Sequence, residues 1–199
     1  VPLISNPNGR YSLEYKIPKT IGYIKSFYGN TAVLLRAYCY ILSLGREGLK
    51  EVSEQAVLSS NYLLSLLDKE SFSSPFSVGH PRMHEFVVSA SSLKKRTGVN
   101  AGDVAKAILD SGMHSPTTYF PLIVPEALMV EPTETESVEN LEVYAATLNS
   151  ISRLAASNSS VVKESPRNTS VGRLDEYRAS HPNTMILNWN ELAKETKAD

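Results

Sequence analysis

The pattern of apolar and polar positions changes character along the first third of the chain. Residues 1–24 contain short alternating segments, such as 11–15, between prolines and glycines, which is typical of extended strands and turns. Helical spacing follows over residues 32–44 and 47–69, and Gly45 separates the two stretches as a left-handed cap would. We therefore expect an extended lead-in followed by an antiparallel pair of helices.

Strand and helix patterns alternate in the middle of the chain. Residues 84–89 and 127–130 are short apolar runs that predict strands. Asn100 is placed to cap a helix with Asp103 in its first turn, where the helix dipole favours an acid, and a second helix follows Ser137. Because the strands are few and short and show no parallel signature, the fold class expected is α+β, with a short, mainly antiparallel sheet covered by helices.

The chain is expected to comprise three parts. Residues 1–24 form the lead-in, and residues 25–156 contain the helix pair and a small α+β domain. Residues 157–199 are more polar and are expected to form a weakly structured extension, with a short helix over 173–178 and an edge strand over 185–189. The chain starts at Val1 without a methionine, so we expect it to be a piece of a longer protein.

Composition narrows the class of protein. Hydrophobic residues make up 42% of the chain and charged residues 21%, with a net charge of −1, as in a globular protein. Basic residues are scattered and matched by acids, which argues against nucleic acid as a partner. No apolar run is long enough for a membrane span. The single Cys39 lies in an apolar helical pattern, so we expect it to be buried and the protein to be cytoplasmic.

The usual templates for an autonomous active site are missing from the sequence. Of the four histidines only His80 and His84 are four residues apart, and Pro81 between them rules out a helical metal site, so no metal is expected. The sequence contains no Gly-x-Ser-x-Gly elbow and no glycine-rich phosphate or dinucleotide loop. What remains is a set of partial sites.

The first partial site is the segment 27–31, Phe-Tyr-Gly-Asn-Thr. It places Gly29, Asn30 and Thr31 at the start of a helix, where backbone N–H groups and the helix dipole favour an anion such as phosphate. The alternative is a capped helix with no ligand.

Two further partial sites carry histidines. His84 stands at the beginning of an apolar strand, where it either meets a partner or a cleft or lies at an exposed strand end. His114 and Thr117 follow a predicted helix end, in a loop that can present an imidazole and hydroxyl groups to a ligand. A histidine there is also stabilised by the helix dipole without any function.

The acidic segment 131–137 precedes the last strong helix. Thr133 and Glu136 have the spacing of a capping box, which accounts for both residues. Glu131 and Glu134 are left for a site wall or an interface.

The order of several short segments resembles the P-protein of the glycine cleavage system, the pyridoxal-phosphate-dependent glycine decarboxylase, and most closely subunit 2 of its split two-chain form. The resemblance covers nearly the whole chain. The segments that carry it are 18–22 (Pro-Lys-Thr-Ile-Gly), 27–30 (Phe-Tyr-Gly-Asn), 56–62 (Ala-Val-Leu-Ser-Ser-Asn-Tyr), 83–86 (Met-His-Glu-Phe), 114–121 (His-Ser-Pro-Thr-Thr-Tyr-Phe-Pro), 128–134 (Leu-Met-Val-Glu-Pro-Thr-Glu) and 173–176 (Arg-Leu-Asp-Glu).

The resemblance implies a fold and an activity. The chain would be the small C-terminal domain of an aspartate-aminotransferase-like fold, with an upstream large domain missing. The parent glycine dehydrogenase (decarboxylating) removes carbon dioxide from glycine and passes the aminomethyl group to the lipoylated H-protein, with P-protein subunit 1 as a further partner. The family anchors its cofactor on the lysine of a His-Lys-Thr motif, and here no lysine follows a histidine. The cofactor lysine is therefore expected upstream of Val1, so the chain alone has no catalytic residue and turns nothing over.

Site residues follow from the resemblance and the partial sites together. Gly29, Asn30 and Thr31 are expected on the phosphate side of pyridoxal phosphate. A second set is expected to line the approach for glycine or the lipoyl arm, and consists of His84, His114, Thr117 and Glu131. The alternative function is a non-catalytic assembly domain with the same fold.

Overall fold

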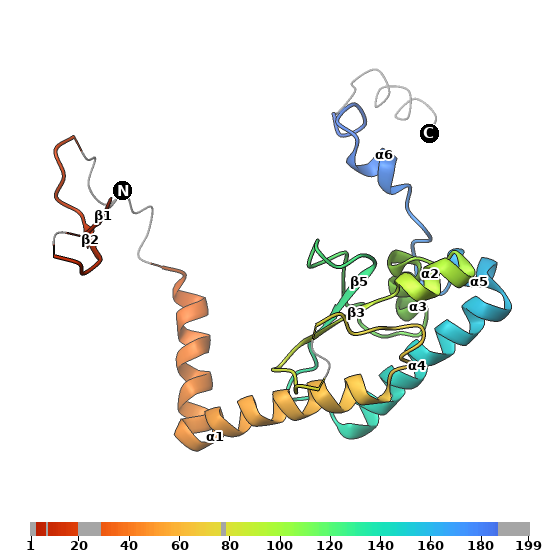
Figure 1. The fold of residues 1–199 in the computed structure, drawn as a ribbon, viewed down its shortest axis with the longest axis horizontal. Coiled ribbons are helices and arrows are strands. Elements are labelled where there is room, and N and C mark those ends of the chain that lie inside the picture. Colours follow the sequence, from red (N-terminus) through yellow and green to blue (C-terminus); the bar gives the residue numbers. More distant parts are fainter. Residues whose placement is uncertain (1–2, 7, 20–28, 77–78, 187–199) are drawn as a thin grey trace, which may run out of the picture. The chain divides into compact units, whose positions relative to one another are not determined.

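The computed structural model describes residues 3–6, 8–19, 29–76 and 79–186 (Figure 1). The chain forms two compact units, Val1–Lys50 and Glu51–Asp199. In the first unit, strands β1 (Leu3–Ser5) and β2 (Ser12–Glu14) pair antiparallel, with Ile4 opposite Leu13. The strand-and-turn character predicted for residues 1–24 is confirmed over residues 3–6 and 8–19, and residues 20–24 lie outside the described residues.

Helix α1 (Thr31–Leu66) consists of two helical segments joined at Gly45, whose φ of 62° and ψ of −169° are not helical. The predicted break at Gly45 is therefore confirmed, because glycine adopts a positive φ without steric cost. The antiparallel packing of the two segments stays a prediction. Cys39 is exposed, so its expected burial is wrong. Its neighbours along the helix are apolar, but no described residue encloses them.

Three short antiparallel strands of the second unit form one sheet in the order β3-β5-β4. They are β3 (Phe86–Ser89), β4 (Thr117–Thr118) and β5 (Ala127–Val130). Phe86 lies opposite Val130 and Val88 opposite Leu128. These four side chains are buried and Met129 is only partly buried, as the period of two requires for a sheet with one face on the core.

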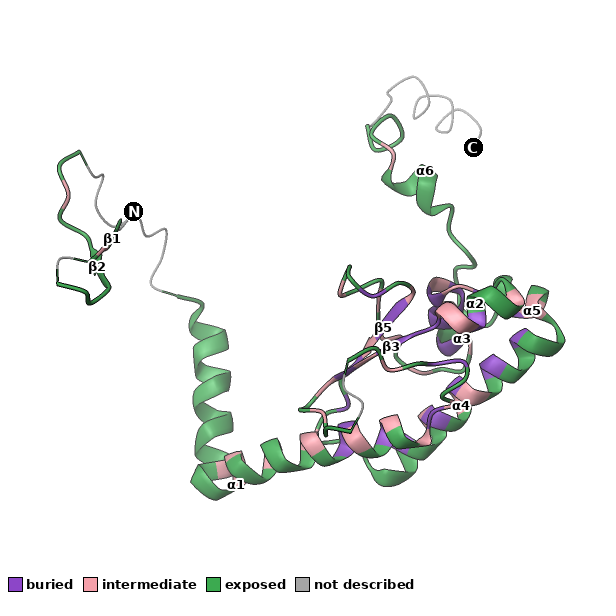
Figure 2. Ribbon diagram, in the orientation of Figure 1, coloured by how far each residue is buried: buried purple, intermediate pink, exposed green. Residues whose placement is uncertain are grey.

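Helices enclose the buried face of this sheet. They are α2 (Ser91–Thr97), α3 (Ala101–Asp110), α4 (Val138–Ser157), α5 (Ser159–Lys163) and the second half of α1. Figure 2 shows that buried residues gather where the helices and the sheet meet. The largest fully buried side chains are Phe72, Phe86, Leu63, Leu93, Ile108, Leu128 and Leu148. The α+β class and the helix-covered antiparallel sheet are confirmed, whereas α2, α5 and the two-residue β4 were not expected.

The start of α3 is capped as the sequence predicts. Asn100 accepts a hydrogen bond from the Asp103 N–H at 2.9 Å, and the Asp103 carboxylate accepts the Asn100 N–H at 3.0 Å. This reciprocal arrangement is a capping box.

The capping box predicted for Thr133 and Glu136 is wrong. Ser137 caps α4, because its hydroxyl accepts the Asn140 N–H at 3.2 Å. The Thr133 hydroxyl bonds that of Thr135 at 2.7 Å, and the Glu136 N–H donates to the Thr133 carbonyl at 3.2 Å. A separate turn therefore uses the threonine before the helix begins.

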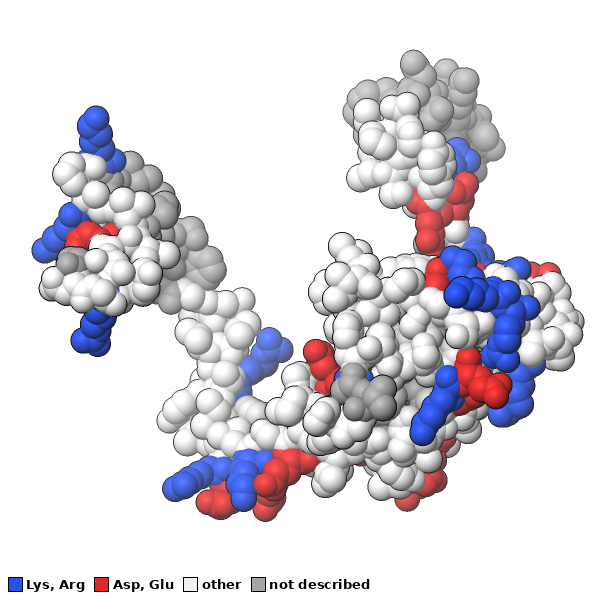
Figure 3. Space-filling view, in the orientation of Figure 1, with Lys and Arg blue, Asp and Glu red and all other residues white. Residues whose placement is uncertain are grey.

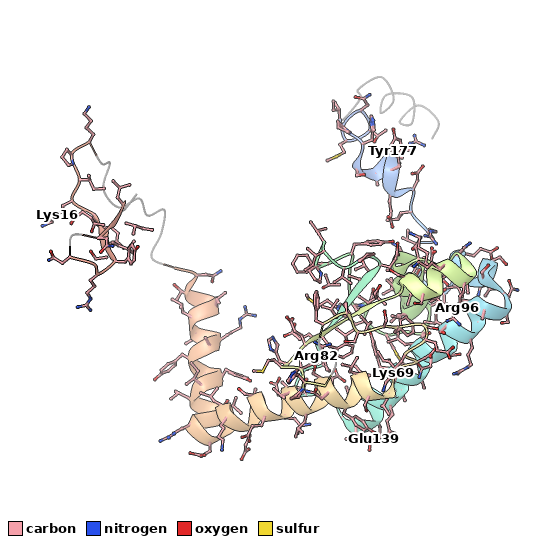
Figure 4. All side chains as sticks on the ribbon, in the orientation of Figure 1. Lys16, Lys69, Arg82, Arg96, Glu139 and Tyr177 are labelled. Atoms are coloured by element: carbon pink, nitrogen blue, oxygen red, sulfur yellow. The ribbon has the colours of Figure 1, made fainter. Side chains whose placement is uncertain are left out.

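The loop predicted over residues 71–82 is tied to its surroundings by side chains. The Asn61 carboxamide of α1 donates to the Arg82 carbonyl at 2.8 Å and accepts the Arg82 N–H at 2.7 Å. Figure 4 shows Arg82 beside this part of α1. A β-bridge joins Ser73 to Ser89 at the end of β3. The loop is therefore held to both α1 and the sheet.

The part of the chain after α4 differs in detail from its prediction. Val162 of α5 is buried within the core, so residues 159–163 are packed more closely than expected of a weakly structured extension. Helix α6 (Glu176–Ser180) begins after Asp175, slightly later than predicted. Met185 and Ile186 lie in a bend rather than a strand, and residues 187–189 lie outside the described residues. The three-part division of the chain stays a prediction.

Among the described residues, no helix combines the length and the hydropathy needed to cross a membrane.

Candidate active-site cleft

One cleft of about 480 Å³ opens in the second unit, at the end of the sheet where β5 leaves it. It lies between the end of α1, the loop after α3, the segment after β5 and the first turns of α4. Its lining residues are Leu63, Met113, His114, Pro116, Val130, Glu131, Pro132, Thr133, Glu136, Asn140, Leu141, Val143 and Tyr144.

The cleft combines an apolar floor with a few polar groups, which is the usual composition of a small-molecule site. Leu63, Val130 and Leu141 belong to the core and form its inner side. Glu131 and Glu136 are the only acidic side chains among the lining residues, and no lysine or arginine is among them. The cleft therefore favours apolar ligands, and cations over anions.

His114 enters the cleft because α3 ends at Asp110, four residues earlier. The chain turns at Gly112, which has a φ of 73°, and the Gly112 N–H donates to the Leu109 carbonyl at 2.9 Å. The Tyr144 hydroxyl donates to the His114 carbonyl at 3.4 Å. Burial raises the pKa of Tyr144 to about 12, so the phenol stays neutral and holds its proton at neutral pH.

The antiparallel register brings His84 beside Glu131. Because Phe86 pairs with Val130, the residues just before β3 lie next to those just after β5. The His84 Nε2 atom is 3.9 Å from the Glu131 Oε1 atom, and both side chains are more than half exposed. Water and salt screen an exposed pair of this kind, so it orients the two groups without adding much stability.

Glu136, Asn140 and Tyr144 also line the cleft, and the sequence analysis did not select them. The Asn140 Nδ2 atom donates to the Glu136 Oε2 atom at 3.1 Å. Asn140 and Tyr144 are four residues apart and lie on the same face of α4, and this spacing could have indicated from the sequence that they belong together.

The other predicted site residues lie elsewhere. Thr117 belongs to β4 opposite Met129 and does not line the cleft. Gly29, Asn30 and Thr31 stand at the start of α1, in the first unit. The Asn30 Oδ1 atom accepts the Val33 N–H at 3.2 Å, so this residue caps the helix. The roles assigned to these residues, and those of His84, His114 and Glu131, stay predictions.

A second polar cluster, which the sequence analysis missed, holds the start of β5. Glu126 has a φ of 52° and its carboxylate accepts the Ala101 N–H at 2.8 Å, while also pairing with the Lys94 ammonium. Burial disfavours the charged carboxylate, but these two hydrogen bonds outweigh it and lower the pKa of Glu126. The Tyr119 hydroxyl accepts the Gly102 N–H at 3.2 Å in the same turn of α3. Both ends of the loop 119–126 are thus fixed to one helix start.

Comparison with known families decides what this domain is. Residues 52–170 match the family described as glycine dehydrogenase, C-terminal domain. The chain belongs to this family. The matched region begins within two residues of the boundary between the two compact units, so it corresponds to the second unit without its last residues.

Relatives of the glycine dehydrogenase family match almost the whole chain. The protein named probable glycine dehydrogenase (decarboxylating) subunit 2 from Pyrococcus furiosus is 50% identical over 200 residues, covering 99% of this chain and 39% of the relative. Those of Pelodictyon phaeoclathratiforme and Thermococcus onnurineus, with the same name, are 52% and 48% identical and cover 90% and 100% of this chain. The chain spans about two-fifths of the length of these relatives.

A solved structure shares the fold. The inhibitor-bound glycine decarboxylase (P-protein) of the glycine cleavage system aligns with a TM-score of 0.53 and 23% identity, over 63% of this chain and 27% of that protein. The resemblance to the P-protein fold is therefore confirmed.

Proposed function

We propose that this chain is the C-terminal part of subunit 2 of a glycine dehydrogenase (decarboxylating), in which it supplies a wall of the active site and part of the subunit interface. The match of residues 52–170 to the family supports this proposal most directly. The parent enzyme would remove carbon dioxide from glycine and transfer the aminomethyl group to the lipoylated H-protein, in the cytoplasm and together with subunit 1. Residues 1–199 alone would not turn over glycine.

The cofactor proposed for the parent enzyme is pyridoxal phosphate, which acts as an electron sink for the charge left when carbon dioxide departs. The start of α1 suits its phosphate group. The first N–H groups of a helix have no partner within it, and Asn30 accepts that of Val33. Among the described residues, the N–H groups of Thr31 and Ala32 have no partner and lie beside the Thr31 hydroxyl. No lysine lines the cleft, so the covalent anchor would come from outside residues 1–199.

The cleft residues would handle substrate in three ways. The apolar floor excludes water, which strengthens electrostatic interactions within the cleft. The imidazole of His114 accepts or donates a proton at a ring nitrogen, and the Glu131 carboxylate holds an ammonium group or a ring N–H such as that of His84. Tyr144 fixes the backbone carbonyl of His114 and so orients the loop that carries the imidazole.

A fusion subunit tests this proposal. It joins the part of the Pyrococcus furiosus subunit 2 that lies outside the match to residues 1–199, and is combined with subunit 1, pyridoxal phosphate and lipoylated H-protein. We expect visible absorbance of bound cofactor and release of labelled carbon dioxide from glycine. His114→Asn and Glu131→Gln are each expected to lower kcat/KM by about 100-fold, the lower end of the range for loss of a positioned proton-transfer group.

Glu139→Gln is the matched control, since Glu139 lies near the start of α4 and points away from the sheet (Figure 4). It is expected to leave kcat/KM unchanged. A fusion subunit that folds but binds no cofactor and releases no carbon dioxide would favour the non-catalytic assembly domain. Equal kcat/KM values for His114→Asn, Glu131→Gln and Glu139→Gln would mean that the cleft is not part of the active site.

A further inference from the structure

The first half of α1, residues 31–44, is an exposed helix with no polar face. Val33, Leu34 and Leu35 are consecutive, so their side chains point about 100° apart around the helix axis. They are 47%, 60% and 60% exposed, and Ile41 and Leu42 are also exposed. Arg36 is the only charged residue in this stretch.

The second half of the same helix differs. Its Ser60 and Leu63 are buried against the domain, whereas Glu47 and Arg46 are more than 80% exposed. Figure 3 shows the same contrast, with the first stretch of α1 mostly white and charged atoms gathered just after the kink. An amphipathic helix needs a partner on one face only, but a helix that is apolar on every side is stable in water only when it is enclosed.

The described residues supply no such enclosure, and the comparisons indicate where it comes from. The family match starts at residue 52, so the apolar stretch lies outside the C-terminal domain. The Pyrococcus furiosus relative matches 99% of the chain, so the stretch belongs to a subunit about three-fifths of which lies outside residues 1–199.

We infer that residues 31–44 form an interior helix of the complete subunit, inserted into an apolar groove of the part of that subunit outside residues 1–199. This inference rests on the proposed function, in which the chain is part of subunit 2. Arg36 pairs with no acid among the described residues, so the groove carries a carboxylate or carbonyl oxygens for its guanidinium. The enclosure ends at Gly45, after which α1 becomes amphipathic.

Cys39 provides a native probe, because it is the only cysteine of the chain and lies exposed in the middle of this stretch. The experiment measures labelling of Cys39 by a maleimide, read by mass spectrometry of its peptide, in the 199-residue chain and in the fusion subunit. We expect labelling in the fusion subunit to be about 100-fold slower, because it then needs local opening of the groove. Leu35 lies one turn before Cys39, and Leu35→Asp is expected to restore fast labelling. Arg46→Asp, beyond Gly45, is expected to leave the protection intact.

Three results would overturn the inference. One is equally fast labelling in both chains when the fusion subunit binds pyridoxal phosphate, an outcome that leaves the proposed function standing. Another is slower labelling of Cys39 in the 199-residue chain alone as the concentration of that chain rises. This result would assign the groove to a second copy of the chain. The last is slow labelling of Cys39 in the fusion subunit that occurs only when subunit 1 is present. Should the fusion subunit fail to fold by circular dichroism, the outside part is added to the 199-residue chain as a separate polypeptide, and absence of Cys39 protection in that mixture counts against the inference.

Discussion

Glu126→Gln tests the polar cluster that holds the start of β5. The Glu126 side chain is only 12% exposed, and its carboxylate accepts the Ala101 N–H at 2.8 Å at the start of α3. Glutamine has nearly the same size and still offers a carbonyl oxygen to that N–H. The substitution therefore removes the charge while leaving the packing almost unchanged.

The expected loss of stability is about 2 kcal/mol. Hydrogen bonds to a charged group contribute about 1.5–3 kcal/mol and neutral ones about 0.5–1.5 kcal/mol, so the exchange costs about 1–1.5 kcal/mol. Loss of a negative charge near a helix start adds about 0.3–1 kcal/mol. The pair with Lys94 adds little, because half of the Lys94 side chain is exposed to solvent. The Tm should fall by about 4–8 °C for a chain of this size.

The effect also depends on pH with a defined sign. The pKa of Glu126 is lowered from its ordinary value of 4.5 in the folded chain, so the unfolded chain binds the proton more tightly. The stabilisation by the carboxylate is therefore complete above pH 4.5 and is lost as the pH falls through the lower, folded pKa. The difference in stability between the wild type and Glu126→Gln should shrink over the same interval.

Urea unfolding of the 199-residue chain, followed by circular dichroism at a series of pH values, measures this difference. Glu70→Gln is the control, because the Glu70 side chain is 86% exposed and its change should stay within about 0.5 kcal/mol. A loss below about 0.5 kcal/mol for Glu126→Gln at neutral pH, or a loss that grows under acid conditions, would refute the reasoning.

Three further outcomes are expected. Ser137→Ala should lower the free energy of unfolding in urea by about 1 kcal/mol, and Thr133→Ala should leave it almost unchanged, because only Ser137 caps α4. Equal losses for the two substitutions would mean that Thr133 also caps the helix. Phe72→Ala should cost about 3–5 kcal/mol because Phe72 is fully buried, and a loss under 1 kcal/mol would contradict its place in the core. A spectrophotometric titration of the wild type should contain a tyrosine that ionises near pH 12, and this component should be absent in Tyr144→Phe. Identical titrations of the two proteins would contradict the burial of Tyr144.

Features set by neighbouring residues were predictable from the sequence. The Asn100 cap with Asp103 in the first turn of the helix, the strand over 127–130 and the break at Gly45 each depend on residues within one turn or one strand. The capping box at Thr133 failed although its spacing was right. Two possible caps compete in that segment, and the turn that uses Thr133 closes before Ser137 starts the helix.

Features set by distant residues were not predictable. Glu126 and Ala101 are 25 residues apart, and no local pattern pairs them. His114 and Glu131 were selected for their residue types, but their common cleft depends on α4 and the end of α1, which supply residues such as Tyr144. The burial expected of Cys39 failed for a related reason, because sequence gives the hydropathy of a helix but not the surface that covers it.

Strand β5 connects the polar cluster around Glu126 with the cleft. Glu126, just before the strand, is locked onto α3, and Glu131, just after it, faces the cleft. Five residues of extended chain span about 17 Å. Four of them are paired with β3, so the strand is held straight and a displacement of one end also moves the other end. Loosening the Glu126 contact at one end would therefore shift the Glu131 carboxylate at the other, so the position of a cleft residue depends on the start of α3, which does not line the cleft.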